Sequence, residues 1–329
     1  MRKENERIRI VNAEPLGYCD EARDVLNQVG EIVEIPLDRA QLLAQLPDTD
    51  VLIVRLAHQI DREAIDAGAH LRVISSATTG LDHIDLDYAR LKGIEVLSLQ
   101  GEMDFLRTVS ATAEHTWALL LALVRRIPAA FASVRAGSWN RDSFRGYELN
   151  GQRLGLVGLG RVARNVARFG MAFSMEVAAF DPDLADWLDG VRRCRSLPEL
   201  MRRSEVLSLH VPLNPGTVGL IGADELALLP PGTVLINTSR GDLVEEGALV
   251  HALRSGALAG AALDFLPGER EPERRLSSPL LTYACDHDNL IITPHIAGAT
   301  HESMAKTEIF MAHKLASFLR SRQARVASL

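Results

Sequence analysis

The sequence predicts an α/β protein with two doubly wound units, each built on a parallel sheet. Two observations support this prediction. Short runs of β-branched and other apolar residues alternate with helix-patterned segments along the chain, and a glycine-rich turn separates the alternation into two series. The 329 residues are enough for two domains, and 47% apolar with 24% charged residues is the composition of an ordinary globular protein.

The first series precedes the glycine-rich turn and contains five strand-like runs. Helix-patterned segments separate these runs, which is typical of parallel strands joined by crossover helices. The expected strands are Ile8–Val11, Ile32–Ile35, Val51–Val54, Leu71–Ser75 and Ile94–Ser98.

A long helix is expected between the two series. Thr108–Ile127 consists of helix formers throughout, and Pro128 is expected to end the helix. A 20-residue helix is about 30 Å long, enough to cross from one domain to the other. Its apolar stretch Trp117–Val124 is far shorter than the roughly 20 residues of a membrane span, so we interpret it as buried helix.

The glycine-rich turn, Gly158-Leu159-Gly160-Arg161-Val162-Ala163, follows the strand-like run Leu154–Val157 and opens a helix-patterned segment. Gly158 permits a tight turn, and Gly160 lets backbone N–H groups approach a pyrophosphate at the helix N-terminus. The small Ala163 allows the helix to pack closely on the strand. A return strand, Val177–Phe180, leads to Asp181, 18 residues after the turn. An acid there suits a ribose diol and would repel a 2′-phosphate. The spacing therefore predicts a Rossmann-like βαβ unit that binds NAD rather than NADP.

The second series continues with further strands and helices. The expected strands are Val206–Leu209, Val234–Asn237, Gly260–Asp264 and Leu290–Thr293, with a helix over Glu246–Leu253 and an irregular loop over Pro267–Pro279. The helical pattern of Glu302–Arg320 predicts a final helix that packs on the first unit.

Charge and cysteine content exclude several classes of function. A net charge of -7 and a pI near 5.8 leave no basic surface for nucleic acid, and the arginines of 192–195 are interpreted as a solvated loop. Cys19, Cys194 and Cys285 are too far apart in sequence for a Cys-x-x-Cys pair, and no histidines or carboxylates have metal-ligand spacing. We expect a cytoplasmic protein with no catalytic metal, no export signal and no membrane partner.

The chain also resembles the D-2-hydroxyacid dehydrogenase family from about Val51 to Ala305. The motifs that carry the resemblance are 80–85 (GLDHID), 113–116 (AEHT), 155–161, 237–241 (NTSRG), 260–264 and 293–299 (TPHIAGA). The resemblance implies a substrate domain, residues 1–107 and 297–329, into which an NAD-binding Rossmann domain, residues 108–296, is inserted.

The family reaction is hydride transfer between NAD and C2 of a 2-hydroxy or 2-oxo acid. By motif, Arg240 would hold the substrate carboxylate with a two-pronged guanidinium. His295 would exchange a proton with the C2 oxygen, a role that suits imidazole near neutral pH. Glu269 would orient the imidazole because it lies five residues after Asp264, although the local Glu-Pro pattern fits Glu271 instead.

The resemblance implies further contacts with the cofactor and the substrate. The expected cofactor-binding residues are Thr79, Gly158, Gly160, Arg161, Val162, Asp181, Val211, Pro212, Thr217, Thr238, Ser239, Arg240, Asp264, His295 and Gly298. The expected substrate-binding residues are Arg55, Ala77, Thr78, Thr79 and Gly80, and the last three can form a small anion-binding turn. His115, within the long helix, is interpreted as a packing or interface residue.

The sequence does not decide which group the substrate carries beyond its 2-hydroxy or 2-oxo acid end. Arg55, Arg107 and Arg141 could bind a phosphate, but Ser76 stands where phosphoglycerate-oxidising relatives often have arginine, so a phosphorylated acid is not favoured over hydroxypyruvate, glyoxylate or a simple 2-oxo acid. An NAD(H)-sensing, corepressor-like binding protein is the alternative function. The resemblance and the apolar helix 108–127 predict a homodimer.

Overall fold

The computed structural model describes residues 7–327, and the chain divides into two compact units. The first unit contains the described residues up to Thr108 together with those from Thr300 onward, and the second is Val109–Ala299. These divisions fall one and three residues beyond the boundaries expected from the sequence, 107 and 296.

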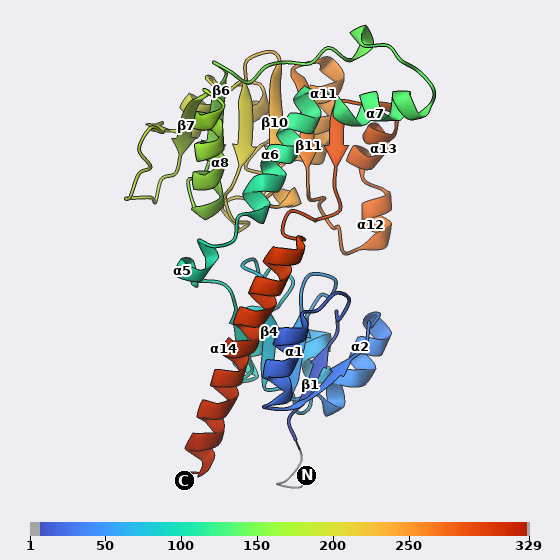
Figure 1. Cartoon of the computed structure of the whole chain (residues 1–329), viewed down its shortest axis with the longest axis vertical. Helices are drawn as coiled ribbons and strands as arrows, with labels where there is room; N and C mark the ends of the chain where they lie inside the picture. The colour runs from blue at the N-terminus through green and yellow to red at the C-terminus, as the bar shows by residue number, and fades with distance from the viewer. Residues whose placement is uncertain (1–6, 328–329) are drawn as a thin grey trace. The chain divides into compact units, whose positions relative to one another are not determined.

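The first unit is built on a five-stranded sheet in which every pair is parallel (Figure 1). The strand order is β2-β1-β3-β4-β5, so the chain winds first to one side of β1 and then to the other. The strands are β1 (Arg9–Asn12), β2 (Glu31–Glu34), β3 (Val51–Val54), β4 (Val73–Ser76) and β5 (Glu95–Ser98). All five expected strands form, with ends shifted by at most two residues.

Helices cover both faces of this sheet and enclose two apolar cores. They are α1 (Asp20–Asn27), α2 (Arg39–Gln45), α3 (Arg62–Ala67), α4 (Leu86–Leu91), α5 (Met103–Leu106) and α14 (His301–Ala327), with a 3₁₀ turn at Leu46–Asp48. Met311 and Leu315 of α14 pack with Leu26 of α1 in one of these cores. The final helix therefore packs on the first unit, as its pattern predicts.

The second unit has a seven-stranded parallel sheet of order β12-β11-β10-β9-β6-β7-β8 (Figure 1). The strands are β6 (Arg153–Val157), β7 (Glu176–Phe180), β8 (Arg192–Arg193), β9 (Val206–Leu209), β10 (Thr233–Asn237), β11 (Leu258–Leu263) and β12 (Leu290–Ile292). The winding direction reverses between β6 and β9, and the crevice beyond such a reversal is where open α/β sheets bind ligands.

One element of this sheet corrects the sequence interpretation. The arginines of 192–195 were expected to form a solvated loop, but Arg192 and Arg193 form the edge strand β8, which pairs with Ala178 and Ala179 of β7. Their side chains are exposed, as the charge pattern suggested. The backbone nevertheless extends the sheet, because charged side chains are common on edge strands.

The helices of the second unit pack on both faces of the sheet. They are α6 (Ala111–Val124), α7 (Ile127–Arg135), α8 (Arg161–Ala172), α9 (Leu197–Met201), α10 (Ala223–Leu226), α11 (Glu246–Ser255), α12 (Pro272–Leu276) and α13 (Pro279–Asp286), with 3₁₀ turns at Asp142–Phe144 and Gly241–Leu243. Figure 1 shows α6 and α8 on one face, where they share an apolar core, while α9, α10, α11 and α13 enclose the core of the other face.

The helix predicted over 108–127 forms, but it is shorter than expected and Pro128 does not end it. The helix α6 ends at Val124, and a second helix, α7, begins at Ile127 after Arg126, which has a left-handed backbone with φ of 53°. Pro128 lies in the first turn of α7, where its missing N–H costs nothing, so it helps to start a helix instead of ending one. The Val124 carbonyl at the end of α6 accepts the Tyr147 N–H. Moreover, α6 lies wholly within the second unit, packed on β10 and β11, and does not cross between domains.

The segment Pro267–Pro279 is also more ordered than expected, because it contains the short helix α12 with Pro272 at its start. No single helix among residues 7–327 is long and apolar enough to cross a membrane, and only the bent pair Met103–Val124 and Ile127–Arg135 meets the length and composition requirement jointly.

Candidate active site

The glycine-rich turn connects β6 to α8 at the point where the strand order reverses. Gly158 has a φ of 87°, and a Cβ atom there would lie 2.9 Å from Val211 Cγ1, so both backbone conformation and space require glycine. Gly160 precedes the first residue of α8, and a Cβ atom there would meet no atom within 4 Å. The N-terminus of this 12-residue helix therefore faces open space, which is where an anion could bind.

Two charged residues hold the turn. The Asp181 carboxylate accepts the Leu159 N–H at 2.9 Å and the Asp183 N–H at 3.2 Å. Arg161, in the first turn of α8, donates to the Val109 carbonyl at 2.7 Å, and burial lowers the pKa of its guanidinium. Asp181 thus lies at the end of β7 beside the turn, where the sequence places it.

The loop after β9 lies next to the same turn. Ser208 Oγ is 2.9 Å from His210 Nε2, and Ser239 Oγ donates to the Val211 carbonyl. Thr217 donates to the Pro212 carbonyl at 2.7 Å and accepts the Asn214 N–H, which closes the loop. The predicted residues Val211, Pro212 and Thr217 therefore belong to one ordered loop beside Gly158.

His210 is expected to make the protein less stable in acid. Burial lowers the pKa of His210 to about 3, whereas a histidine in the unfolded chain titrates near 6.5. The unfolded state therefore binds the extra proton as the pH falls from about 6.5 to 3, and the free energy of unfolding decreases by up to about 1.4 kcal/mol per pH unit from this group. Urea denaturation of wild type and His210→Gln between pH 7 and 4.5 measures the difference.

A matched control for this measurement is His251→Gln, since His251 is an exposed histidine of α11 in the same unit. The stability of this control should follow the wild-type pH dependence, and the His210→Gln curve should be flatter. Parallel curves for wild type and His210→Gln would contradict the assignment.

The residues after β10 include the predicted carboxylate-binding arginine. Thr238 Oγ1 is 2.6 Å from Thr116 Oγ1 of α6, which ties the strand end to the helix. Asn237 stabilises the next turn, since its side chain donates to the Arg240 carbonyl and accepts the Ser239 N–H. The Arg240 guanidinium donates to the Ser239 carbonyl at 2.7 Å. Arg240 thus projects from the C-terminal end of β10.

Asp264 organises the neighbouring loop after β12. Its fully buried carboxylate accepts the N–H groups of Ile296 at 2.9 Å and Ala297 at 2.7 Å, and the Thr293 hydroxyl at 2.6 Å. Burial raises the pKa of this carboxyl, but hydrogen bonds from His115, Thr293 and the two amides outweigh burial and lower the pKa below its ordinary value. Asp264 therefore stays charged and fixes the loop that carries His295.

His115 has a more specific position than the sequence interpretation gave it. Its Nε2 atom lies 3.1 Å from Thr293 Oγ1 and 3.4 Å from the Asp264 carboxylate. The histidine of α6 thus joins the network that supports the loop. Sequence reasoning had only one signal for this role, the position of His115 within the motif 113–116.

The structure brings Glu269 and His295 together. His295 Nδ1 lies 2.7 Å from Glu269 Oε1. The side chain of His295 is 17% exposed and that of Glu269 is 22% exposed. Glu271, the alternative, instead contacts Arg274 at 3.7 Å and its side chain is 68% exposed. With Nδ1–H donating to the carboxylate, the nitrogen that can exchange a proton is Nε2.

The backbone of His295 is strained. Its φ of 57° is uncommon for a residue other than glycine, and its N–H donates to the carbonyls of Asp264 and Thr293 at 3.0 Å each. Such conformations persist only where the surroundings impose them, and they concentrate at functional sites. Gly298, three residues on, is exposed, and a Cβ atom there would meet no atom within 4 Å.

The predicted substrate residues of the first unit follow β3 and β4. Thr78 donates to the Gly80 carbonyl at 2.9 Å and is 2.9 Å from Ser76 Oγ, so residues 77–80 form a compact turn in which Thr79 is exposed. Arg55 donates to the carbonyls of Glu14 and Leu16 and to the Glu308 carboxylate. Its guanidinium thus connects the loop after β1 with α14.

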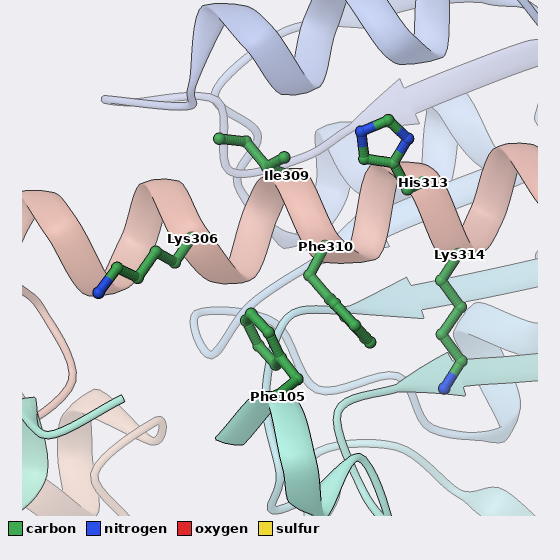
Figure 2. Close-up of a pocket in the computed structure, with 6 residues that line it drawn as sticks. All are labelled: Phe105, Lys306, Ile309, Phe310, His313 and Lys314. Carbon is green, nitrogen blue, oxygen red and sulfur yellow. The ribbon is translucent and has the colours of Figure 1, made fainter. Parts of the chain in front are cut away.

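A cavity of about 520 Å³ also lies in the first unit, between α5 and α14 (Figure 2). The rings of Phe105 and Phe310 stack at 4.1 Å in it, and Lys314 pairs with Glu102. Its lining residues are Phe105, Lys306, Ile309, Phe310, His313 and Lys314. None of the predicted site residues lines this cavity, and no group of His, Cys, Asp or Glu among residues 7–327 could hold a metal ion.

Comparisons with known proteins agree with the motifs. The family model described as "D-isomer specific 2-hydroxyacid dehydrogenase, NAD binding domain" matches residues 117–297. D-3-phosphoglycerate dehydrogenase of Methanocaldococcus jannaschii is 36% identical over 318 residues, which cover 95% of this chain. The chain spans 58% of the length of that relative.

Solved structures share the fold over nearly the whole chain. The TT0316 protein from Thermus thermophilus is 34% identical with a TM-score of 0.79, and the match covers 93% of this chain and 94% of that one. D-lactate dehydrogenase from Aquifex aeolicus, in complex with NAD and lactic acid, is 28% identical with a TM-score of 0.82, and the match covers 97% and 98% of the two chains.

Proposed function

Because the chain belongs to the D-isomer specific 2-hydroxyacid dehydrogenase family, we propose that it transfers hydride between NAD and C2 of a small 2-hydroxy or 2-oxo acid. The observation that carries the proposal is the pair of His295 Nδ1 and Glu269 Oε1 at 2.7 Å, on a loop beside the strand end that bears Arg240. An imidazole held by a carboxylate is the arrangement expected of a general acid and base.

Each of the three side chains has a defined task. The Arg240 guanidinium binds the substrate carboxylate with two parallel hydrogen bonds and polarises the neighbouring oxo group. His295 Nε2 donates a proton to the C2 oxygen during reduction and accepts it during oxidation. The Glu269 carboxylate accepts the Nδ1–H, which fixes the ring and the tautomer.

The residues around the glycine-rich turn fit a dinucleotide. Gly160 leaves space at the N-terminus of α8 for a pyrophosphate, Arg161 is in its first turn, and the carboxylate of Asp181 suits a ribose diol. Bound NAD supplies the hydride acceptor. The negative charge of Asp181 disfavours the 2′-phosphate of NADP, which supports the choice of NAD.

Gly160→Ala is expected to weaken NADH binding by at least about tenfold, since a methyl group would fill the space that the pyrophosphate needs. The fold should tolerate this change, because the added Cβ meets no protein atom within 4 Å. Fluorescence titration with NADH and thermal unfolding measure the two effects separately. Gly158→Ala is the contrasting variant, because it introduces a clash with Val211 and should lower the unfolding temperature as well.

The substrate class is a small 2-oxo acid, and a phosphorylated acid belongs among the candidates because curated relatives are D-3-phosphoglycerate dehydrogenases. The arginines considered for a phosphate have other partners. Arg107 pairs with Asp104 and Arg141 with Asp142, both as exposed side chains, while Arg55 contacts Glu308. Nothing in these contacts favours a phosphate over an unphosphorylated tail.

Incubation of the purified protein with NADH and a panel of 2-oxo acids tests the proposed function. The panel contains hydroxypyruvate, glyoxylate, pyruvate and 3-phosphohydroxypyruvate, absorbance of NADH is followed over time, and NADPH is the control. Rapid oxidation of NADH by one acid supports the proposed dehydrogenase activity and identifies which group the substrate carries. Tight NADH binding without turnover on any acid would favour the alternative, an NAD(H)-sensing binding protein.

We further propose a homodimer, on grounds that differ from the sequence expectation. The apolar residues of α6, such as Trp117 and Leu120, are buried in the core of their own unit and are not available to a partner. In contrast, Ile127, Phe131 and Val134 lie on one face of α7 and are 53%, 63% and 49% exposed. An exposed apolar face of this kind can pair with its own copy across a twofold axis.

Phe131→Asp is expected to convert the dimer to a monomer, because it places a charge in the centre of the apolar face of α7. Sedimentation velocity over a range of concentrations measures the change. Val218→Asp is the matched control, since Val218 is 62% exposed but lies elsewhere in the second unit. A wild-type protein that sediments as a monomer at every concentration would contradict the proposal.

A reducing compartment such as the cytoplasm is part of the same proposal. Cys19, Cys194 and Cys285 are all free thiols, which is typical of proteins that remain in a reducing environment.

A further inference from the structure

One aromatic ring contacts two of the three proposed catalytic side chains. Phe265 directly follows Asp264 at the end of β11 and is only 5% exposed. Its ring centroid lies 4.1 Å from that of the His295 imidazole, with the planes tilted by 55°. The Arg240 guanidinium carbon lies 5.2 Å from the same Phe265 centroid.

The backbone fixes this arrangement. Gly241 packs so closely on the loop after β11 that a Cβ atom there would lie 2.5 Å from the carbonyl carbon of Leu266 and from the Pro267 nitrogen. The turn that carries Arg240 is therefore held against the segment that carries Phe265. The ring contact with the guanidinium follows from this close approach of two loops.

Hydrogen bonds restrain both the side chain and the backbone of His295. Glu269 holds His295 through Nδ1, and the carbonyl of Asp264 holds its backbone, but neither of these two hydrogen bonds involves Arg240. A guanidinium is attracted to the negative face of an aromatic ring, and such contacts strengthen where water is excluded. Phe265 thus ties the position of one group to that of the other.

We propose that Phe265 is a positioning residue that sets the spacing between the Arg240 guanidinium and the His295 imidazole. The inference rests on the proposed function, in which one group binds the carboxylate and the other serves the oxygen on the adjacent carbon. The spacing of Arg240 and His295 must therefore match the fixed, short distance between the substrate carboxylate and the C2 oxygen. Small displacements of such groups slow catalysis strongly.

Two variants separate the aromatic face from simple core packing. Phe265→Leu removes the ring, and 3,4,5-trifluorophenylalanine at position 265, introduced by amber suppression, keeps the shape but weakens the negative face. The leucine variant should lower kcat by about tenfold or more, in line with a misplaced catalytic group. The fluorinated ring should raise the KM for the 2-oxo acid by about two- to fivefold, the effect of losing a cation–π contact. The affinity for NADH should stay unchanged in both.

A spectroscopic measurement is independent of turnover. In protein with ¹³C-labelled histidine, the His295 ring protons should move when Phe265→Leu removes the ring current, and His295→Gln identifies the signal. If wild type reduces no acid, the proposed function fails while this shift still tests the ring contact. Wild-type kinetics for the fluorinated ring, or an unmoved His295 signal in the leucine variant, would overturn the proposal.

Discussion

Arg240→Ala is expected to lower kcat/KM for the 2-oxo acid by about 10³-fold at saturating NADH. The guanidinium binds the carboxylate through charge-assisted hydrogen bonds and polarises the oxo group, and the loss of one such preorganised donor costs about 10²–10³-fold in rate. Arg240 Nη1 donates to the carbonyl of the adjacent Ser239, and thermal unfolding of the variant checks that the fold is kept. Steady-state kinetics measures the loss, and NADH titration separates it from any loss of cofactor affinity.

Two further variants make this expectation specific. Arg240→Lys keeps the charge but not the two-pronged geometry, so it should recover only part of the lost activity. Arg254→Ala is the matched control, because the Arg254 guanidinium lies 5.9 Å from the Tyr283 centroid, a ring contact similar to that of Arg240. Activity of Arg240→Ala within a few-fold of wild type would exclude Arg240 as the carboxylate-binding residue.

Much of the fold could be predicted from the sequence because parallel strands buried on both faces leave strong local signals. Val51–Val54 and Val206–Leu209 are continuous runs of largely apolar residues, and the structure has strands with these bounds. The edge strand β8 could not be predicted this way. Its residues are two exposed arginines, and only the pairing with β7 makes them a strand.

The break between α6 and α7 shows a second limit. A proline after a helical pattern can end one helix or begin another, and the local sequence is the same in both cases. The left-handed Arg126 and the capping of Val124 by the Tyr147 amide favour the second outcome. Tyr147 is distant in sequence from the helix it caps, so periodicity carries no sign of it.

Some residues of the candidate site can be predicted from local sequence spacing, and others only from three-dimensional contacts. Gly158, Gly160 and Asp181 follow from spacing, because a βαβ unit fixes where its turn and its second strand end. The choice between Glu269 and Glu271 depends on which carboxylate the loop turns toward His295, and only the three-dimensional contact distinguishes them. The contacts of Phe265 join three strand ends and leave no pattern in the sequence.

The strained backbone of His295 helps to fix the orientation of its imidazole. A non-glycine residue in the left-handed region costs about 1–3 kcal/mol at a functional site. The buried Asp264 carboxylate accepts the N–H groups of Ile296 and Ala297, and the Asp264 carbonyl accepts the His295 N–H. The surroundings therefore impose one orientation on the imidazole, with Nδ1 toward Glu269. A side chain held in this way should be sensitive to replacement of either partner.

His295→Gln is expected to lower kcat by about 10²–10⁴-fold, the usual contribution of a general acid and base. Glu269→Gln should lower kcat less, since the imidazole remains but its orientation loses support. His287→Gln is the control for the first variant, because His287 also has an aromatic contact, to Tyr283 at 3.9 Å, and an Nδ1 hydrogen bond. Glu271→Gln is the control for the second. If Glu271→Gln lost more activity than Glu269→Gln in steady-state kinetics with the same acid, the orienting role would pass to Glu271, and the 2.7 Å contact would be structural only.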